Sequence, residues 1–146
     1  MNPRQNAAKA YLNQVYRLEQ RINSKLEQVA RLRSMAKHMT VSYGAEPVSR
    51  TRNVSSMEDA ILKIMMVERE IDQTIDAMLA QRKEIETTIQ LVTDPDSRTL
   101  LELRYLAFKE WEEIAVIFRC SSSYAHRMHR RALLLIDAIL ASKEAG

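Results

Sequence analysis

The chain has 146 residues, of which 46% are hydrophobic and 28% charged, with only 2 glycines and 3 prolines. This length suits about one domain with a core and excludes an enzyme with a separate substrate domain. So few glycines and prolines leave little material for tight hairpins, and the many Leu, Ile, Met, Ala, Glu, Lys and Arg residues favour helix. We therefore expect an all-α protein.

The formal net charge of +3 is distributed unevenly along the chain. Residues 1–56 carry ten basic and three acidic side chains, residues 57–94 carry four and nine, and residues 95–146 carry eight and seven. Cys120 is the only cysteine, which excludes an intrachain disulfide. No apolar leader and no apolar stretch of about 20 residues is visible, so we expect a cytoplasmic protein with no membrane partner.

The first expected element is a long helix from Pro3 to about Met39. Asn2 suits the N-cap, Pro3 the first helical position, and Gln5 the partner position of a capping box. Apolar residues then recur every three or four positions and predict one buried stripe. They are Tyr11, Val15, Leu18, Ile22, Leu26, Val29, Leu32 and Ala36.

A second long helix is expected after a loop at about residues 40–54, where Gly44 and Pro47 interrupt the pattern. Ser55 and Glu58 predict a capping box at the start of this helix. A heptad-like seam then continues to the end of the helix. Its members are Met57, Ile61, Ile64, Ile71, Ile75, Met78, Ile85, Ile89 and Val92.

These two helices have similar lengths and opposite charges, which predicts a long antiparallel two-helix coiled-coil hairpin as a domain of residues 1–93. Two helices of an ordinary bundle are the alternative. A lone pair of helices leaves Leu62, Met65, Met66 and Leu79 uncovered. We therefore expect the hairpin to pack against the C-terminal residues or to form a homodimer.

Asp94-Pro95-Asp96 ends the second helix and starts a third, with Asp94 as the N-cap. We place the domain boundary here, with a second domain over residues 94–146. Its three helices are expected from Pro95 to about Leu106, from about Trp111 to Phe118, and from about Ser122 to Leu140 or beyond.

The last two of these helices have the pattern of a helix-turn-helix, which presents one helix to the major groove of DNA. Glu110, Glu112 and Glu113 lie on the first helix, whereas residues 119–131 hold four arginines, two histidines and no carboxylate. Ala115 fits the crossing point of the two helices. The small core is predicted to contain Ile114, Phe118, Ala125 and Met128, with Leu100, Leu103 and Leu106 as its third wall.

The exposed face of the helix at 122–140 is the predicted DNA-contacting surface. Arg119 and Arg131 are placed to reach phosphates, and the other polar side chains of this face are offered to the groove. The predicted DNA-binding residues are Arg119, Ser121, Ser122, Ser123, Tyr124, His126, Arg127, Arg130 and Arg131.

Three segments in the last third of the chain resemble region 4, the C-terminal domain of bacterial sigma factors. They are Leu103-Arg104-Tyr105-Leu106, Trp111-Glu112-Glu113-Ile114-Ala115 and Arg127-Met128-His129-Arg130-Arg131-Ala132-Leu133. This resemblance implies a three-helix helix-turn-helix unit of the kind that reads the −35 promoter element. With the two long helices before it, the chain is similar to phage late-transcription regulators of the RinA and ArpU type, which implies a phage or prophage regulator in a bacterial host cell.

Two turns depart from the region 4 pattern. Phe108-Lys109-Glu110 stands where the family usually has glycine and a Ser or Thr cap, and Arg119 stands where glycine is common. A residue other than glycine in a left-handed conformation costs about 1 kcal/mol, which a well-packed unit can absorb. We expect the fold to tolerate both substitutions.

Other kinds of site are not predicted. Cys120, His126 and His129 lack a fourth ligand and the paired spacing of known zinc modules, so we predict no metal site. The chain has no nucleophile elbow, no phosphate-binding glycine loop and no pair of acids in a pattern typical of burial, so we predict neither a cofactor nor enzymatic activity.

The sequence thus predicts a sequence-specific DNA-binding transcriptional regulator whose partner is double-stranded DNA. Its hairpin is expected to form a homodimer or to contact bacterial RNA polymerase. One alternative is a DNA-packaging protein like the small subunit of a phage terminase, assembling into rings. Another is an interaction module that binds RNA polymerase without touching DNA.

Overall fold

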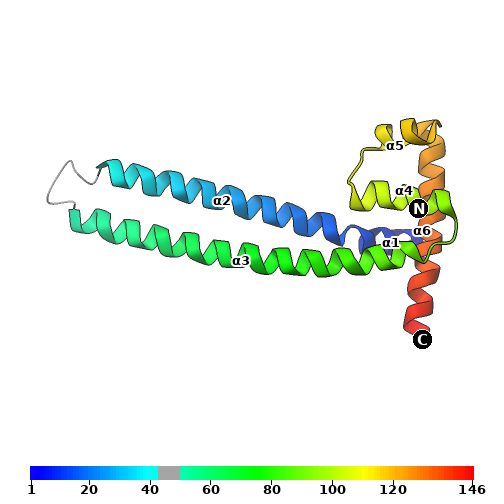
Figure 1. The fold of residues 1–146 in the computed structure, drawn as a ribbon, viewed down its shortest axis with the longest axis horizontal. Coiled ribbons are helices and arrows are strands. Elements are labelled where there is room, and N and C mark those ends of the chain that lie inside the picture. Colours follow the sequence, from blue (N-terminus) through cyan, green and yellow to red (C-terminus); the bar gives the residue numbers. More distant parts are fainter. Residues whose placement is uncertain (43–49) are drawn as a thin grey trace. The chain divides into compact units, whose positions relative to one another are not determined.

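The computed structural model describes the backbone of residues 1–42 and 50–146 and the side chains of residues 1–38 and 55–146. This part of the chain is helical and contains no strand, which confirms the all-α prediction. The elements are α1 (Pro3–Leu12), α2 (Gln14–Ser42), α3 (Arg50–Gln90), α4 (Pro95–Leu101), the π-helix η1 (Glu102–Leu106), α5 (Trp111–Phe118) and α6 (Ser122–Ala145) (Figure 1). Among the described residues, no helix is both long enough and apolar enough to cross a membrane.

The chain forms two compact units. One consists of Leu18–Ala77, and the other combines Met1–Arg17 with Met78–Gly146. We predicted a domain boundary between residues 93 and 94, and the two units do not divide there. The reason is that α1 and the last turns of α3 share a core with the C-terminal helices.

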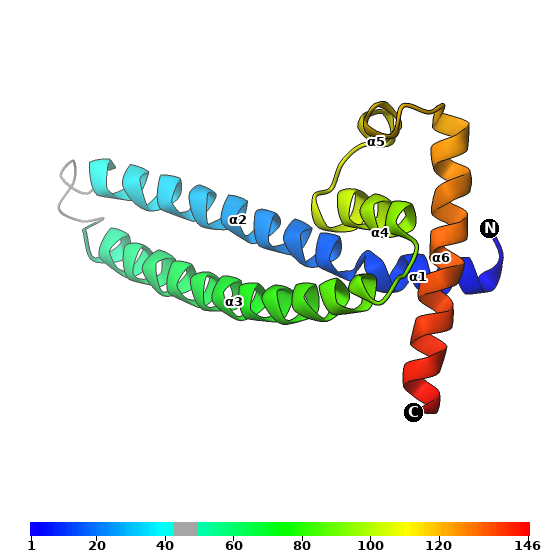
Figure 2. The same ribbon diagram turned by 45° about the vertical axis from the view of Figure 1, so that its right-hand side comes forward.

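The unit of Leu18–Ala77 is an antiparallel helical hairpin, as predicted, in which α2 and α3 lie side by side (Figures 1 and 2). Ile22 and Val29 of α2 and Val67 and Ile71 of α3 are buried in it, with 6–8% of each side chain exposed. Two ion pairs join the helices, Lys25 to Glu70 at 2.5 Å and Arg33 to Glu68. The opposite charges of the two helices are therefore partly paired with each other.

The predicted first helix is interrupted. Asn13 separates α1 from α2 with φ −77° and ψ −3°. An asparagine side chain competes with helical backbone hydrogen bonds, which makes such a break inexpensive. Leu12 and Val15, one on each side of the break, are both buried in the core of their unit. Continuity from Pro3 to Met39 was therefore wrong.

The predicted start of the second helix at Ser55 is also wrong, because α3 begins at Arg50. Residues 50–54 contain neither glycine nor proline, so nothing in the sequence stops the helix from extending toward its N-terminus. The predicted loop is correspondingly shorter, since residues 40–42 and 50–54 are helical. Its remaining part, including Gly44 and Pro47, lies outside the described residues.

Two members of the predicted apolar stripes face outward. Leu26 is 51% exposed and Ile61 is 48% exposed, so neither belongs to the hairpin seam. Within this unit the buried positions of α3 are the predicted Ile71 and, in addition, Ala60, Val67 and Thr74. The small side chain of Ala60 fits the narrow space between two helices, and the seam therefore runs along a face adjacent to Ile61.

The other unit has a hydrophobic core, built from α1, the end of α3 and the helices after Pro95. Its fully buried side chains include Leu12 of α1, Ile85 and Ile89 of α3, and Leu133 and Ile136 of α6. In both ribbon views α1 crosses α6, while α4 and α5 lie on one side of α6 (Figures 1 and 2). The long helix α6 is thus the element around which this unit packs.

Both predicted N-caps of this unit are confirmed. The Asn2 side chain accepts a hydrogen bond from the Gln5 N–H and the Gln5 side chain accepts one from the Asn2 N–H, each at 2.9 Å. Asp94 accepts hydrogen bonds from the N–H and the hydroxyl of Ser97, which lower the pKa of its carboxyl group. Pro95 then occupies the first turn of α4. These local signals start both helices where the sequence predicted.

Candidate nucleic-acid interface

The turn between α5 and α6 closes without glycine. Arg119 has φ 52° and ψ 47°, in the left-handed region. Its N–H donates to the Val116 carbonyl at 3.1 Å, and the Cys120 N–H donates to the Ala115 carbonyl at 3.0 Å. These hydrogen bonds satisfy the last carbonyls of α5 and offset a conformational cost of about 1 kcal/mol. Phe108, in the other turn that departs from the region 4 pattern, has a similar φ of 55°.

Ser121 is the N-cap of α6. Its hydroxyl oxygen accepts a hydrogen bond from the Tyr124 N–H at 3.1 Å. The side chain is nevertheless exposed, as are those of Ser122 and Ser123 in the first turn. Ser121 therefore fixes where α6 begins and stands at the edge of the predicted interface.

The predicted crossing of α5 and α6 is present. Ile114 and Ala125 are fully buried, and Ala115 is almost so. Leu100 of α4 is also fully buried, as expected for the third wall. The remaining predicted core residues are half-buried, namely Phe118, Met128, Leu103 and Leu106.

Trp111 links α5 to the inner side of α6. Its ring centroid lies 4.5 Å from that of His126 and 4.6 Å from that of His129. The Arg104 guanidinium lies over the same ring at 4.8 Å and donates to the Lys109 carbonyl at 2.9 Å. Stacking and cation–π contacts of this kind orient the rings they join. The sequence placed Trp111 and Arg104 in the region 4 pattern without assigning them this orienting role.

His126 is consequently less accessible than predicted. The sequence placed it on the face offered to the groove, but its ring is half-buried against Trp111. The other predicted residues at 119–131 carry exposed side chains. His126 therefore lies at the margin of the face.

His129 belongs to the core. It is 4% exposed, and its Nε2 shares a 2.5 Å hydrogen bond with the Tyr105 hydroxyl. Burial, reinforced by nearby cations that include Lys9 and Arg104, lowers the pKa of His129 to about 3. The imidazole is therefore neutral near pH 7 and adds no charge to the interface. Its position four residues after Ala125 and four before Leu133 places it on the buried stripe of α6, a signal that the sequence contains.

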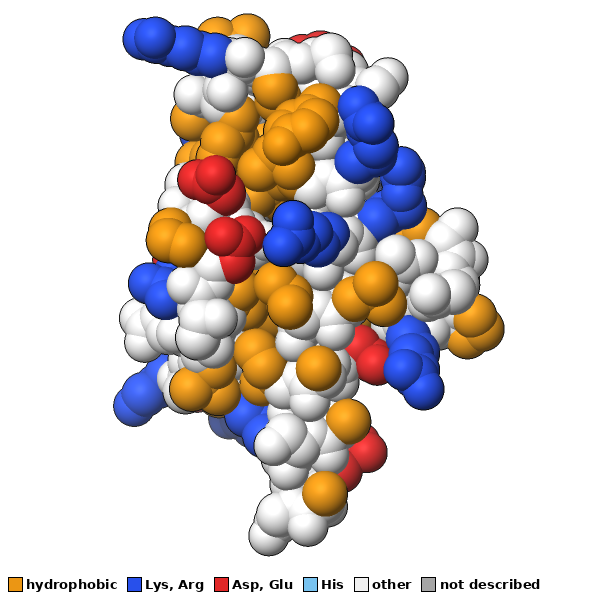
Figure 3. Space-filling view, turned by 90° about the vertical axis from the view of Figure 1, so that its right-hand side faces the viewer, with side chains coloured by type: hydrophobic (Ala, Val, Ile, Leu, Met, Phe, Trp, Pro, Cys, Tyr) orange, Lys and Arg blue, Asp and Glu red, His pale blue; other side chains and the backbone are white. Residues whose placement is uncertain are grey.

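The outward face of α6 carries the predicted cations. Arg127, Arg130 and Arg131 are exposed, as is Arg119 in the preceding turn. The stretch from 119 to 131 contains no carboxylate that would neutralise them. In the space-filling view, basic side chains lie to the right of and below a hydrophobic area in the upper part of the visible face, and acidic side chains lie to its left (Figure 3).

Three of these arginines have neighbours that interact with the side chain, the backbone or the charge. The Arg127 guanidinium lies 5.5 Å from the centroid of the Tyr124 ring. The Arg130 carbonyl accepts a hydrogen bond from the Gln5 side chain at 3.1 Å, which ties α1 to α6. Arg131 is close enough to Asp94 to contribute to the lowered pKa of that carboxyl group. Arg127 is therefore the arginine of this face whose guanidinium contacts an aromatic ring.

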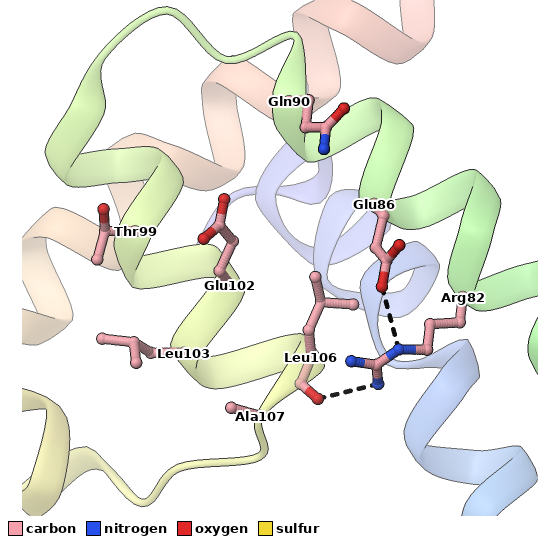
Figure 4. Close-up of a pocket in the computed structure, with 8 residues that line it drawn as sticks. All are labelled: Arg82, Glu86, Gln90, Thr99, Glu102, Leu103, Leu106 and Ala107. Atoms are coloured by element: carbon pink, nitrogen blue, oxygen red, sulfur yellow. Dashed lines mark hydrogen bonds and ion pairs between the residues drawn. The ribbon is translucent and has the colours of Figure 1, made fainter.

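A separate hollow of about 500 Å³ lies between the end of α3 and the helices α4 and η1 (Figure 4). Arg82 spans it, pairing with Glu86 at 3.1 Å and donating to the Leu106 carbonyl at 3.0 Å. Glu102 also lines it. Because two carboxylates face this hollow and its one cation is already paired, the hollow is unsuited to a phosphate backbone.

The residues near the interface with side chains that can bind metals are Cys120, His126 and His129. Within residues 1–42 and 50–146, no group of three or more His, Cys, Asp or Glu side chains is arranged to hold a metal ion. Cys120 is half-buried, and the His126 and His129 rings pack against Trp111 in tilted and edge-on orientations. The histidines therefore act as packing groups here.

A model of the family described as "Protein of unknown function (DUF1492)" matches residues 48–137, which include all of α3, α4, η1 and α5 and most of α6. No curated protein and no solved structure matches the chain significantly.

Proposed function

The chain belongs to this family of unknown function, and from its own site we propose that it is a sequence-specific transcriptional regulator that binds double-stranded DNA. In this proposal α6 enters the major groove and presents Arg127 and Arg130 to it, while Arg119 and Arg131 reach the phosphates. The observation that carries the proposal is the arginine-bearing outward face at the start of α6, where residues 119–131 contain no carboxylate.

The construction of α6 supports this role. A recognition helix must be held rigidly enough to place side chains against base edges. Here the Ser121 cap fixes the start of α6, and the buried Ala125 and the Tyr105–His129 hydrogen bond hold its next turns from the inner side. Ala125 and His129 lie on the side of the helix opposite Arg127, so neither constraint covers the outward face.

The proposed class is that of sigma factor region 4 and of the phage regulators of the RinA and ArpU type. Three observations support it: the order of α4, α5 and α6, the small residue Ala115 where α5 and α6 cross, and the buried Ile114 and Ala125 between them. A phage or prophage regulator of late transcription is the function this class implies.

The proposal is tested by binding of the full chain to duplex DNA selected from random sequences. Arg127→Ala or Arg130→Ala should weaken binding by about 1–3 kcal/mol if the residue meets a base. Loss of a phosphate contact should instead reduce the slope of log affinity against log salt by about 0.9. Arg31→Ala, which removes an exposed arginine from the hairpin, is the matched control and should bind like the parent.

Two results would contradict the proposal. If the parent chain binds no duplex at low salt, the DNA-binding function is wrong. If the parent binds but both arginine variants bind equally well, α6 is not the reading helix. Sedimentation of the protein–DNA complex separates a regulator from a ring-forming packaging protein, because a ring contains many copies.

A second candidate function is binding to RNA polymerase without DNA, and one feature of α5 favours it. Val116 and Ile117 are 77% and 51% exposed, beside the exposed acids Glu112 and Glu113. An apolar patch with an acidic border suits a protein partner better than a phosphate backbone. Co-elution with core polymerase, lost in Val116→Glu and retained in Arg127→Ala, would support this candidate.

A further inference from the structure

α3 has a second apolar face, directly opposite the one it buries in the hairpin. Leu62, Met65 and Met66 on this face are 58%, 60% and 63% exposed. With the Arg69, Glu70 and Gln73 side chains they line a shallow hollow of about 490 Å³. The spacing of 62, 65, 66, 69 and 73 places these residues on one side of a helix, about half a turn from the buried Val67 and Ile71.

The helix pair cannot bury this face by itself. Its buried residues, Ile22, Val29, Val67 and Ile71, all retain 6–8% exposure, whereas the core of the other unit contains several residues at 0%. Contiguous exposed apolar surface of this kind marks an interaction site. Methionine side chains are flexible and fit such interfaces well.

The charges at the two ends of the face identify the occupant. Glu58 precedes the apolar residues by one turn and Arg69 follows them by one turn, on the same edge of the helix. Within the described residues neither of them forms an ion pair. A second copy of α3, packed antiparallel about a two-fold axis near residues 63 and 64, brings Glu58 of each copy to Arg69 of the other.

The other edge of α3 does not oppose this pairing. Glu70 lies there, and the pKa of its carboxyl group is lowered by its hydrogen bond to Lys25 and by the charges of Lys25, Arg21 and Lys63. The cations that lower this pKa also reduce repulsion between acids of the two copies along this edge. The pattern is therefore self-complementary, as an isologous interface requires.

We propose that the protein forms a homodimer through the face of α3 formed by Glu58, Leu62, Met65, Met66 and Arg69. In this dimer the Leu62 and Met65 side chains of one copy pack against those of the other, and Glu58 pairs with Arg69 at both ends. The two hairpins then form an antiparallel four-helix arrangement around α3. This inference does not depend on DNA binding.

Sedimentation velocity of the full chain over a range of concentrations tests the proposal. The parent should be a dimer, and Met65→Glu should weaken dimerisation at least about tenfold, because it places a carboxylate in the apolar centre. Met35→Glu is the matched control, since Met35 is 48% exposed on α2 and lies outside the face. Both substitutions are at exposed positions, so circular dichroism should show unchanged helix content.

A charge swap tests the antiparallel pairing itself. Arg69→Glu should weaken the dimer several-fold, and Arg69→Glu combined with Glu58→Arg should restore it toward the parent. A parent that is monomeric at all soluble concentrations, or that forms a larger ring, would overturn the inference. So would a dimer that Met65→Glu leaves intact, or a charge swap that fails to rescue. A monomeric parent that still binds DNA would refute the dimer and leave the proposed function standing.

Discussion

The Tyr105 hydroxyl and the His129 Nε2 share a hydrogen bond of 2.5 Å inside the C-terminal unit, between the π-helix η1 and α6. Tyr105 is 3% exposed and His129 is 4% exposed. Burial raises the pKa of the Tyr105 phenol far above its usual value and lowers that of His129, so both groups are neutral. This polar contact, between two neutral buried groups, holds the inner side of α6.

Removing the Tyr105 hydroxyl should destabilise the protein. In Tyr105→Phe the buried His129 Nε2 loses its partner, and leaving such a group unsatisfied costs about 1–3 kcal/mol. Urea unfolding followed by circular dichroism measures this loss. Tyr124→Phe removes the same hydroxyl from a side chain that is 50% exposed, and its free energy of unfolding should stay within about 0.5 kcal/mol of the parent. Equal effects of the two substitutions would contradict the role assigned to Tyr105.

Stability should fall in acid because of His129. Its pKa is about 3 in the folded protein, compared with 6.5 for an unperturbed histidine. Between these values the unfolded chain binds one more proton than the folded one, so protonation favours unfolding as the pH falls. His129 alone should remove about 1.4 kcal/mol per pH unit over this window, and its contribution to stability is fully present above pH 6.5. A folded His129→Gln variant that keeps the same pH slope of unfolding free energy as the parent would refute this assignment.

The N-cap of α6 should be sensitive to loss of a single hydroxyl. Ser121→Ala removes the acceptor of the Tyr124 N–H and should cost about 1 kcal/mol in the free energy of unfolding. Ser122→Ala, one residue later in an exposed position of the helix, removes an identical group that caps nothing and should be neutral or slightly stabilising. Thermal unfolding of the two variants side by side is the measurement. If Ser122→Ala proves the more damaging, the cap is misassigned.

Replacing Arg119 by glycine should destabilise the protein less than replacing it by alanine. Both Arg119→Gly and Arg119→Ala remove the guanidinium, but only glycine adopts φ 52° without a steric penalty. The glycine variant should be more stable than the alanine variant by about 1 kcal/mol. At Glu112, inside α5 and exposed, the order should reverse, because glycine disfavours helix. The unfolding free energies of the four variants are the measurement. The same order at both positions would contradict a left-handed backbone conformation at Arg119.

The helix-turn-helix was well predicted because its signals are local. Asp94 and Pro95 start α4, Trp111 and Phe118 bound α5, and Ser122 begins α6 where the sequence placed it. Caps and turns depend on residues within a few positions of each other, so they can be read from the chain directly. The alternation of acidic α5 with arginine-rich α6 is equally visible in the sequence.

The sequence by itself determined the all-α class, the antiparallel pairing of two oppositely charged helices, and the arginines at 119, 127, 130 and 131. Only the tertiary structure decided that α1 breaks at Asn13 to join the C-terminal core, that His129 is buried on Tyr105, and that Trp111 covers His126. Helical periodicity gives the face on which a residue lies, but the partner that covers that face comes from segments distant in the chain. Gln5 and Arg130 are 125 positions apart and still share a hydrogen bond, a contact that no local pattern encodes.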